Sequence, residues 1–388
     1  MNILLIAPQP FFQDRGTPIA VRMMAETLGE MGHTVHLLVY HEGSDVHLDN
    51  VVMHRSMNLP WIRGIKPGLT FKKLFCDIFV FIKCLQLMRC IRFDLIHAVE
   101  ESVFMARIIK TFTGKPYIYD MDSSLSLQVA DKFPLLSFFR GPMELLEKTA
   151  VKNSVGVIAV CKVLEEIAIG YAPDNSTILR LEDVTLLDSD QKGEENLRLK
   201  YHLTGSVLMY VGNLEKYQGI DLLLESFVKV VDVTADVHLL LIGGSDDDID
   251  HYRNQVLEMN LEGKAILCGP RPINLLGYYL DQADILLSPR IQGNNTPMKI
   301  YSYLDTGKPV LATRLGTHTQ VLGDDIACLV APDAEAMADG IIRLLHGLTQ
   351  ALTKCGIMQQ PDNAIGHSLC IRGNQTGHII TKNLGMRS

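Results

Sequence analysis

The sequence predicts an α/β fold with two Rossmann-like domains. The chain has 388 residues, more than one hydrophobic core usually organises. Short apolar runs alternate with helical stretches throughout, which is typical of βαβ units and a parallel sheet. The alternation starts anew after the polar, acidic segment Glu182–Asn196. We therefore predict a first domain over residues 1–185 and a second over residues 186–348.

The first domain is expected to begin with a strand, because Met1 leads directly into an apolar run. This start shows no basic, apolar and cleavage regions of a secretory signal, so we expect a cytoplasmic protein. The predicted strands are Ile3–Ala7, Thr34–Tyr40, Leu95–Ala98, Tyr117–Met121 and Val155–Val160. The predicted helices include Ile19–Met31, Phe71–Arg92 and Val103–Phe112.

The second domain repeats this order of elements with its own apolar runs. Its predicted strands are Val207–Val211, Val237–Ile242, Ala265–Cys268, Ile285–Leu287, Val310–Ala312 and Ala327–Val330. After Gly347 the sequence lacks sustained periodicity of either kind. We therefore expect residues 349–388 to form an atypical, poorly ordered tail.

The composition argues against several classes of protein. A net charge of −8 lacks the basic excess of a nucleic-acid binder. The eight cysteines contain no CxxC pair, and most lie in apolar runs, which indicates reduced and mostly buried thiols. Because the chain has no HExxH motif and no paired Cys/His set, we expect no zinc site.

One segment, residues 61–93, combines apolar and basic residues. Asp77, Lys83 and Arg89 interrupt it before it is apolar enough to span a bilayer. As a helix, it places a broad apolar arc largely opposite its charged residues. This arc comprises Leu74, Phe75, Ile78, Phe81, Ile82, Leu85 and Met88. Two interpretations stay open: peripheral contact with an anionic membrane, at the inner face of the plasma membrane, or a helix that simply covers the sheet.

Two predicted loops follow strands at the edge where open α/β sheets bind ligands. The first, Pro8–Pro18, enters a helix whose N-terminus can hold an anion or substrate, with Gly16 and Thr17 as contributors. The second, Tyr210–Leu222, can wrap a diphosphate. Its candidate residues are Gly212, Asn213, Lys216, Gln218 and Gly219. The alternative for each loop is an ordinary βα turn.

A third such loop, Ser288–Pro309, carries the most information. It predicts a helix with Thr296 as its N-cap and Pro297 in its first turn. Lys299, expected one turn into this helix, can direct a cation toward a phosphate, and Arg290 supplies a second cation. The further candidates are Gly293, Asn294, Asn295 and Ser302. The alternative is that both cations are solvated surface charges and the asparagines form a simple turn.

Acidic candidates lie at the end of a predicted strand of the first domain. Asp120 and Asp122 could ligate Mg²⁺, serve as a base or position a sugar hydroxyl. A capping or loop role for one of them is the alternative. His97 could be a ligand, but a histidine in such a strand is more often a satisfied core residue.

The third loop resembles the donor-site region of the family-4 retaining glycosyltransferases of the GT-B fold. The resemblance is to a bacterial branch with the motif NTPxKIY, which here is Asn295–Tyr301, followed by Gly307–Pro309. Other matching pieces are Arg15–Pro18, Gly32–Val35, Gly212–Leu214, Gln218–Asp221 and Gly316–Thr319. Together these pieces run in order through residues 1–346.

The resemblance implies two Rossmann-like domains that face each other across a cleft. It also implies a nucleotide-sugar donor held mainly by the second domain, transfer with retained configuration, and no metal or other cofactor. Cations and helix N-termini then neutralise the leaving diphosphate. Asp120, Asp122 and Asn294 are the catalytic candidates. Two glutamates common in the family correspond here to Asn294 and Ser302, so the charge-assisted hydrogen bonds of those glutamates are lost.

These features predict a glycosyltransferase that acts on a glycan or lipid-linked acceptor, in assembly of a surface polysaccharide or glycolipid. Two alternatives remain. A nucleotide-sugar epimerase of GT-B shape would need acid and base groups around the sugar C2. A non-catalytic sugar-nucleotide-binding protein would account for the missing glutamates and the atypical tail.

Overall fold

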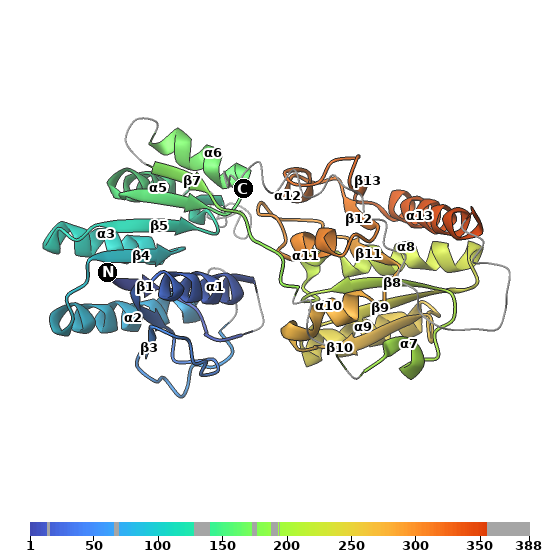
Figure 1. Ribbon diagram of the computed structural model, residues 1–388, viewed down its shortest axis with the longest axis horizontal. Coiled ribbons are helices and arrows are strands. Elements are labelled where there is room, and N and C mark those ends of the chain that lie inside the picture. The colour runs from blue at the N-terminus through green and yellow to red at the C-terminus, as the bar shows by residue number, and fades with distance from the viewer. Residues whose placement is uncertain are drawn as a thin grey trace. The chain divides into compact units, whose positions relative to one another are not determined.

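The computed structural model describes residues 1–13, 16–65, 70–127, 140–172, 177–187, 193 and 195–354, which form two compact units (Figure 1). Contacts assign Met1–Asp183 and Asn294–Pro297 to unit 1. Unit 2 contains Val184–Gly293 and the residues from Met298 onward. Each unit has its own parallel sheet, so the predicted α/β class with two Rossmann-like domains is confirmed.

Unit 1 contains a seven-stranded parallel sheet with the order β3-β2-β1-β4-β5-β6-β7. Residues of its central strands alternate between a core under α1 and a larger core under α2, α3, α5 and α6. The strands are β1 (Asn2–Ile6), β2 (Thr34–Val39), β3 (Val51–Arg55), β4 (Leu95–Val99), β5 (Tyr117–Met121), β6 (Gly156–Ala159) and β7 (Thr177–Arg180). The described helices are α1 (Gly16–Glu30), α2 (Phe71–Cys90), α3 (Ser102–Thr113), α5 (Arg140–Asn153) and α6 (Lys162–Tyr171).

Unit 2 contains a six-stranded parallel sheet with the order β10-β9-β8-β11-β12-β13. Both faces are buried, which explains the continuous apolar runs of its central strands. The strands are β8 (Ser206–Val211), β9 (Val237–Ile242), β10 (Ala265–Gly269), β11 (Ile285–Ser288), β12 (Val310–Thr313) and β13 (Cys328–Val330). The helices are α7 (Leu197–Lys200), α8 (Ile220–Val233), α9 (Asp246–Glu258), α10 (Leu276–Leu280), α11 (Lys299–Asp305), α12 (Gly316–Thr319) and α13 (Ala334–Lys354), with short 3-10 turns η2 (Lys216–Gln218) and η3 (Ile273–Leu275).

The structure differs from the predicted elements mainly at edges and ends. The strands β3 and β7, which the sequence does not predict, lie at the two edges of the unit 1 sheet and are partly exposed, so they lack a long apolar run. The helix α1 begins at Gly16, three residues before the predicted start. The helix α13 packs against α8 and includes residues 349–354 of the predicted tail. The rest of that tail lies outside the described residues.

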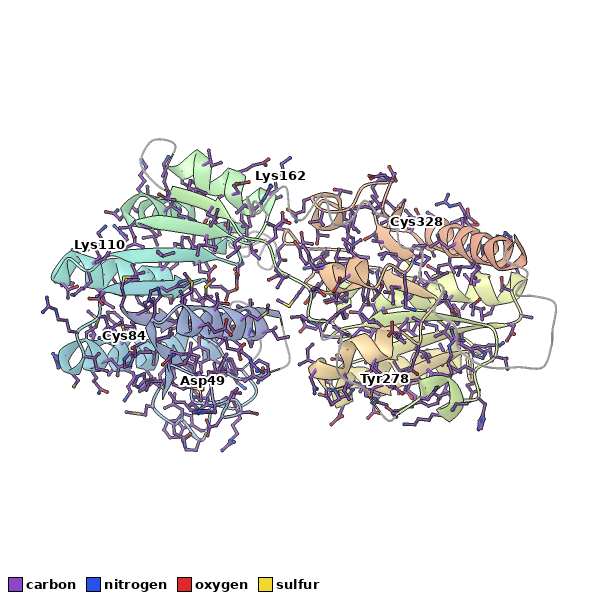
Figure 2. All side chains as sticks on the ribbon, in the orientation of Figure 1. Asp49, Cys84, Lys110, Lys162, Tyr278 and Cys328 are labelled. Carbon is purple, nitrogen blue, oxygen red and sulfur yellow. The ribbon has the colours of Figure 1, made fainter. Side chains whose placement is uncertain are left out.

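The helix α2 covers the sheet with a stripe other than the predicted apolar arc. Its buried stripe is Lys73, Cys76, Val80, Cys84 and Leu87, of which Cys84 is labelled in Figure 2. Most of the arc is exposed instead, with side chains between 40% and 60% accessible at Leu74, Phe75, Ile78, Ile82 and Leu85. None of the described helices is long and apolar enough to cross a membrane.

Candidate active site

Two of the three predicted loops meet at one point of the unit 2 sheet. The strand order reverses beside β8, so β8 and β11 are neighbours whose following loops diverge, the position where open α/β sheets bind ligands. The Ile291 N–H donates to the Tyr217 carbonyl at 2.9 Å, which ties the two loops together. Gly219, with φ at +75°, allows this approach, because a Cβ there would lie 2.1 Å from the Pro289 oxygen.

Lys299 places its amine between these loops. It is the first residue of α11, and its Nζ donates to Gln218 Oε1 at 3.3 Å and lies 3.8 Å from the centroid of the Tyr210 ring. Burial, followed by repulsion from Arg290, holds the pKa of this amine well below its ordinary value. An anion that binds beside Nζ would favour the charged amine. This environment fits a phosphate site better than a solvated surface lysine.

Arg290 lies beside Lys299 and is only 8% exposed. Its Nε donates to the Gln292 carbonyl at 2.7 Å, and its guanidinium lies 5.1 Å from the centroid of the Tyr217 ring. Burial lowers the pKa of Arg290. The interpretation of Arg290 as a solvated surface charge is therefore wrong. A glycine is needed at Gly293, where φ is +130° and a Cβ would lie 2.4 Å from Arg290 Nη2.

Gly212 and Asn213 form the turn that follows β8. A Cβ at Gly212 would lie 2.7 Å from Lys299 Nζ, so the missing side chain leaves room for the amine. The Asn213 amide donates to the Tyr217 hydroxyl at 3.2 Å, and the Asn213 carbonyl accepts from the Tyr210 hydroxyl at 2.5 Å. Asn213 therefore shapes the turn. The predicted donor Lys216 begins η2 and is exposed.

The start of α11 corrects the predicted helix. The helix begins at Lys299 with Met298 at its N-cap, so Thr296 is not the cap and Lys299 lies in the first turn. Asn294 is exposed and Asn295 half-buried, and both belong with Thr296 to unit 1 by their contacts. Thr296 is buried, and within the described part of the chain its Oγ1 has no hydrogen-bond partner.

Ser302 is fully buried in α11, and its hydroxyl accepts a hydrogen bond from the Leu186 N–H at 3.0 Å. One turn later, Asp305 accepts from the Thr185 hydroxyl at 2.8 Å. These two bonds attach the segment that enters unit 2 to α11. The structure thus gives Ser302 a structural partner and places it out of contact with solvent, and its role in donor binding stays a prediction.

In unit 1, the predicted residues lie at the same kind of sheet edge. Gly16 is exposed and Thr17 half-buried in the first turn of α1, and a Cβ at Gly16 would meet open space. Asp120 Oδ2 lies 2.8 Å from His97 Nε2, and both residues are buried. His97 is thus a core residue with a hydrogen-bond partner, which is the more frequent of the two roles considered from the sequence. This bond holds the Asp120 carboxylate of β5 against His97 of β4.

Asp122 belongs to a group of carboxyls that sequence reasoning did not assemble. Burial, and then the charges of Asp120, Glu100 and Asp183, hold its pKa well above the ordinary value. Burial and the charge of Asp120 raise the pKa of Asp183 to about 7. Glu100, which directly follows β4, has φ at +50°, a left-handed conformation that is uncommon for glutamate. Its position at a strand end was the one sequence signal available for it.

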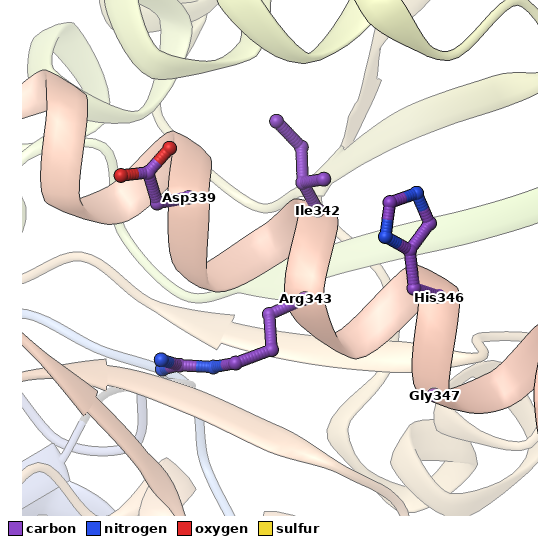
Figure 3. Close-up of a pocket in the computed structure, with 5 residues that line it drawn as sticks. All are labelled: Asp339, Ile342, Arg343, His346 and Gly347. Atoms are coloured by element: carbon purple, nitrogen blue, oxygen red, sulfur yellow. The ribbon is translucent and has the colours of Figure 1, made fainter.

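A surface hollow of unit 2 lies away from the predicted site residues. A hollow of about 550 Å³ lies along α13, where Figure 3 shows Asp339, Arg343 and His346 beside it. None of the predicted site residues lines it. Among the described residues, no group of three or more His, Cys, Asp or Glu side chains is arranged to hold a metal ion.

The two parallel sheets define an α/β protein with two Rossmann-like units, and unit 2 carries two buried cations after its strand ends. Residues 205–347 match the model of the family described as glycosyl transferases group 1. Over this region the chain is similar to the group 1 glycosyl transferases, in line with the resemblance seen in the sequence.

Two curated proteins are similar to part of the chain. The chain is 26% identical over 158 residues to a phosphatidyl-myo-inositol mannosyltransferase of Mycobacterium leprae, covering 38% of this chain and 39% of that protein. It is 25% identical over 177 residues to the enzyme of the same name from Mycolicibacterium smegmatis, covering 45% and 42%. The matches therefore span about two fifths of the length of these relatives.

Solved structures support the fold over a longer range. Sucrose-phosphate synthase from Thermosynechococcus elongatus matches with a TM-score of 0.69 and 21% identity, covering 90% of this chain and 91% of that chain. Anabaena HepE in complex with UDP-glucose matches with a TM-score of 0.68 and 15% identity, covering 90% and 91%. WaaG, a glycosyltransferase involved in lipopolysaccharide biosynthesis, matches with a TM-score of 0.68 and 14% identity, covering 91% and 93%.

Proposed function

We propose that this chain is a retaining glycosyltransferase that uses a nucleotide-sugar donor. The observation that carries the proposal is the Lys299 amine, which is held by an aromatic ring and an amide oxygen where the strand order of unit 2 reverses. It lies within the region that matches the group 1 family. The HepE structures with bound UDP and UDP-glucose support a nucleoside diphosphate or its sugar ester as the ligand class.

The chemistry of the donor site follows from charge. When the sugar–phosphate bond breaks, negative charge develops on the leaving diphosphate, and fixed cations stabilise it without reorganisation. Lys299 and Arg290 would supply that charge, with the loop Gly212–Gly219 around the phosphates. We propose that the reaction needs no metal. Full activity after treatment with a chelator is the expected result, and loss restored by Mg²⁺ would contradict it.

The acceptor is proposed to meet the carboxyls of unit 1. A protonated Asp122, favoured by its raised pKa, can donate a hydrogen bond to an acceptor oxygen, and the ionised form can orient a hydroxyl. Asp120 would hold the strand end through His97. Asn294 is proposed to contact the donor sugar through its amide. These roles remain predictions for each of the three residues.

We propose a lipid-linked acceptor, with α2 as the part of unit 1 that contacts an anionic membrane. The exposed arc of α2 gives an apolar surface, and exposed basic residues accompany it. In the described part of residues 61–93, the basic residues with exposed side chains are Arg63, Lys72, Arg89 and Arg92, and Trp61 is 74% accessible. The names of the curated relatives, which act on phosphatidyl-myo-inositol, agree with a lipid acceptor.

The test of the donor site compares two lysines of unit 2. Purified chain is incubated with a panel of nucleotide sugars and a lipid extract, and nucleotide release and product are followed. Lys299→Ala should abolish donor binding or turnover. The control Lys229→Ala, an exposed lysine paired with Glu335, should retain both. Binding without turnover would support a non-catalytic protein, a C2 epimer would support an epimerase, and equal activity of Lys299→Ala and wild type would refute the site.

The test of the membrane surface uses co-sedimentation with vesicles rich in anionic phospholipid. Replacing Leu74 and Ile78 of the arc by glutamate should abolish sedimentation. The control Phe112→Glu changes an apolar residue on α3 that is 84% accessible, and it should sediment like the wild type. Wild-type chain that stays in the supernatant would refute the proposal.

A further inference from the structure

His318 lies in α12, fully buried, and neither the predicted site nor the proposed mechanism uses it. Its Nε2 is 2.8 Å from Ser288 Oγ, at the end of β11. Its Nδ1 is 2.8 Å from the Thr313 carbonyl oxygen, at the end of β12. The ring therefore joins the ends of two neighbouring strands at the ligand edge of the sheet.

The partners of the ring fix its tautomer. A carbonyl oxygen only accepts, so Nδ1 carries the proton that it donates to Thr313. Nε2 is then the acceptor, and the Ser288 hydroxyl donates to it. The Thr313 hydroxyl donates in turn to the Arg290 carbonyl at 2.5 Å. The Nδ1–H also lies 3.1 Å from Thr313 Oγ1, which can accept from it while its own proton goes to Arg290. Ser288, Thr313 and His318 are all fully buried.

The charges around the ring agree with a neutral histidine. Burial lowers the pKa of His318 to about 4, against the opposing effect of its bond to the Thr313 backbone. The nearby cations Arg290 and Lys299 contribute to this lowering of the pKa. A second proton on the ring would face both cations, so the Nδ1–H form is retained at neutral pH.

We propose that His318 is a positioning residue of the donor site, which acts through Thr313 and Ser288 to fix the backbone that carries Arg290. The inference rests on the proposed donor site. Ser288 and Arg290 are two residues apart, so the network holds the backbone on both sides of Pro289. Without it, the guanidinium would lose the fixed position that preorganised binding of a diphosphate requires.

The first experiment changes one hydroxyl of the network. Thr313→Val keeps the shape of the side chain but removes the donor to the Arg290 carbonyl, whereas Thr313→Ser keeps the donor. Calorimetric titration with UDP and with inorganic pyrophosphate should show affinity about tenfold weaker for Thr313→Val. Thr313→Ser should bind like the wild type. The control Thr204→Val removes an exposed hydroxyl bonded to Asp236 in the same unit and should bind normally.

A purely structural role predicts a different outcome. Thr313→Val would then melt at a lower temperature but bind UDP with wild-type affinity once folded, and this result would overturn the proposal. Wild-type chain that binds neither UDP nor pyrophosphate would instead refute the proposed donor site.

A second measurement examines the His318 ring in the wild-type chain. Nitrogen NMR of the wild-type histidine rings, with the His318 signal assigned by its loss in His318→Asn, reports the tautomer directly. We expect a protonated Nδ1 and a bare Nε2 that stay unchanged from neutral pH to about pH 5. A protonated Nε2, or titration near the ordinary value of 6.5, would overturn the inferred network.

Discussion

Gly212 illustrates how single residues set the geometry of the candidate donor site. Its φ is +146°, which side chains rarely adopt, and a Cβ would meet Lys299 Nζ at 2.7 Å and the Tyr210 hydroxyl at 3.1 Å. The Gly212 carbonyl also comes so close to Gly243 that a Cβ there would lie 2.1 Å from it. The turn therefore depends on backbone conformation and on empty space as much as on polar side chains.

Replacing Gly212 by alanine should weaken diphosphate binding. The new methyl group strains the backbone, by about 1–3 kcal/mol, and displaces the Lys299 amine. We expect UDP affinity to fall at least tenfold, measured by calorimetric titration. The control Gly347→Ala lies in α13, where a Cβ meets nothing within 4 Å, and should bind as the wild type does. Unchanged affinity in Gly212→Ala would contradict the assignment of this turn.

Lys299 also predicts a pH dependence. Its pKa lies well below the ordinary 10.5, and a bound diphosphate favours the charged amine. Binding should therefore take up a proton, and affinity should fall as pH rises through the pKa of the free amine. UDP titrations at about pH 8, where the nucleotide phosphate is already ionised, measure the uptake in two buffers of different protonation enthalpy. A heat of binding that does not depend on the buffer would refute this prediction.

The sequence located the loops of the site better than the roles of their residues. Glycines and cations after a strand predict a phosphate site, and the neighbouring positions of β8 and β11 bring two such loops together. The partners that define Lys299, Tyr210 and Gln218, come from other elements, so no local pattern reveals them. The bond that the Ser302 hydroxyl accepts from the distant Leu186 N–H is likewise not visible in any local pattern.

At the scale of elements, α2 shows why an amphipathic pattern alone does not give orientation. The apolar arc faces outward, whereas the inward-facing stripe includes a charged side chain, Lys73, that has ion-pair partners. Lys73 Nζ lies 2.5 Å from Glu101 Oε1 and 3.5 Å from Glu100 Oε2, and the Tyr40 hydroxyl lies 2.5 Å from Asp77 Oδ1. A buried lysine is tolerated only with such partners, and those of Lys73 come from the residues directly after β4.

Removing the buried cation of α2 should destabilise unit 1 in a pH-dependent way. Burial raises the pKa of Glu101 to about 7 and that of Asp77 to about 6. Lys73→Met leaves these carboxyls without their cation, which we expect to cost about 3–5 kcal/mol of unfolding free energy when they are ionised. The cost should shrink below about pH 6, because carboxyls with raised pKa values take up protons in the folded state.

Urea denaturation of full-length Lys73→Met at about pH 8 and about pH 5 measures this difference. The matched control is Lys72→Met, an exposed neighbour on the same helix, for which a change within about 0.5 kcal/mol is expected at both pH values. Destabilisation of Lys73→Met by the same amount at both pH values would show that lost packing, rather than uncompensated charge, sets the cost.

At the scale of the whole molecule, the repeated strand and helix pattern predicted the fold class because buried parallel strands are continuous apolar runs. Interior strands such as β5 and β9 coincide with their predicted bounds. Edge strands escaped prediction, since a half-exposed strand such as β7 has a mixed composition. The same burial that makes interior strands visible in the sequence also gives each unit a core of its own.

Separate cores predict separate unfolding. Leu38→Ala removes a fully buried side chain from the larger core of unit 1, and Leu241→Ala does the same in unit 2. Each should cost about 2–5 kcal/mol, so calorimetry of the full chain should show two transitions, each lowered by one variant only. UDP binds folded unit 2 in our proposal, so it should raise only the transition that Leu241→Ala lowers, by about 2.7 kcal/mol in stability at a hundredfold excess over Kd. One transition shifted equally by both variants and by UDP would mean that the two cores unfold as a single cooperative body.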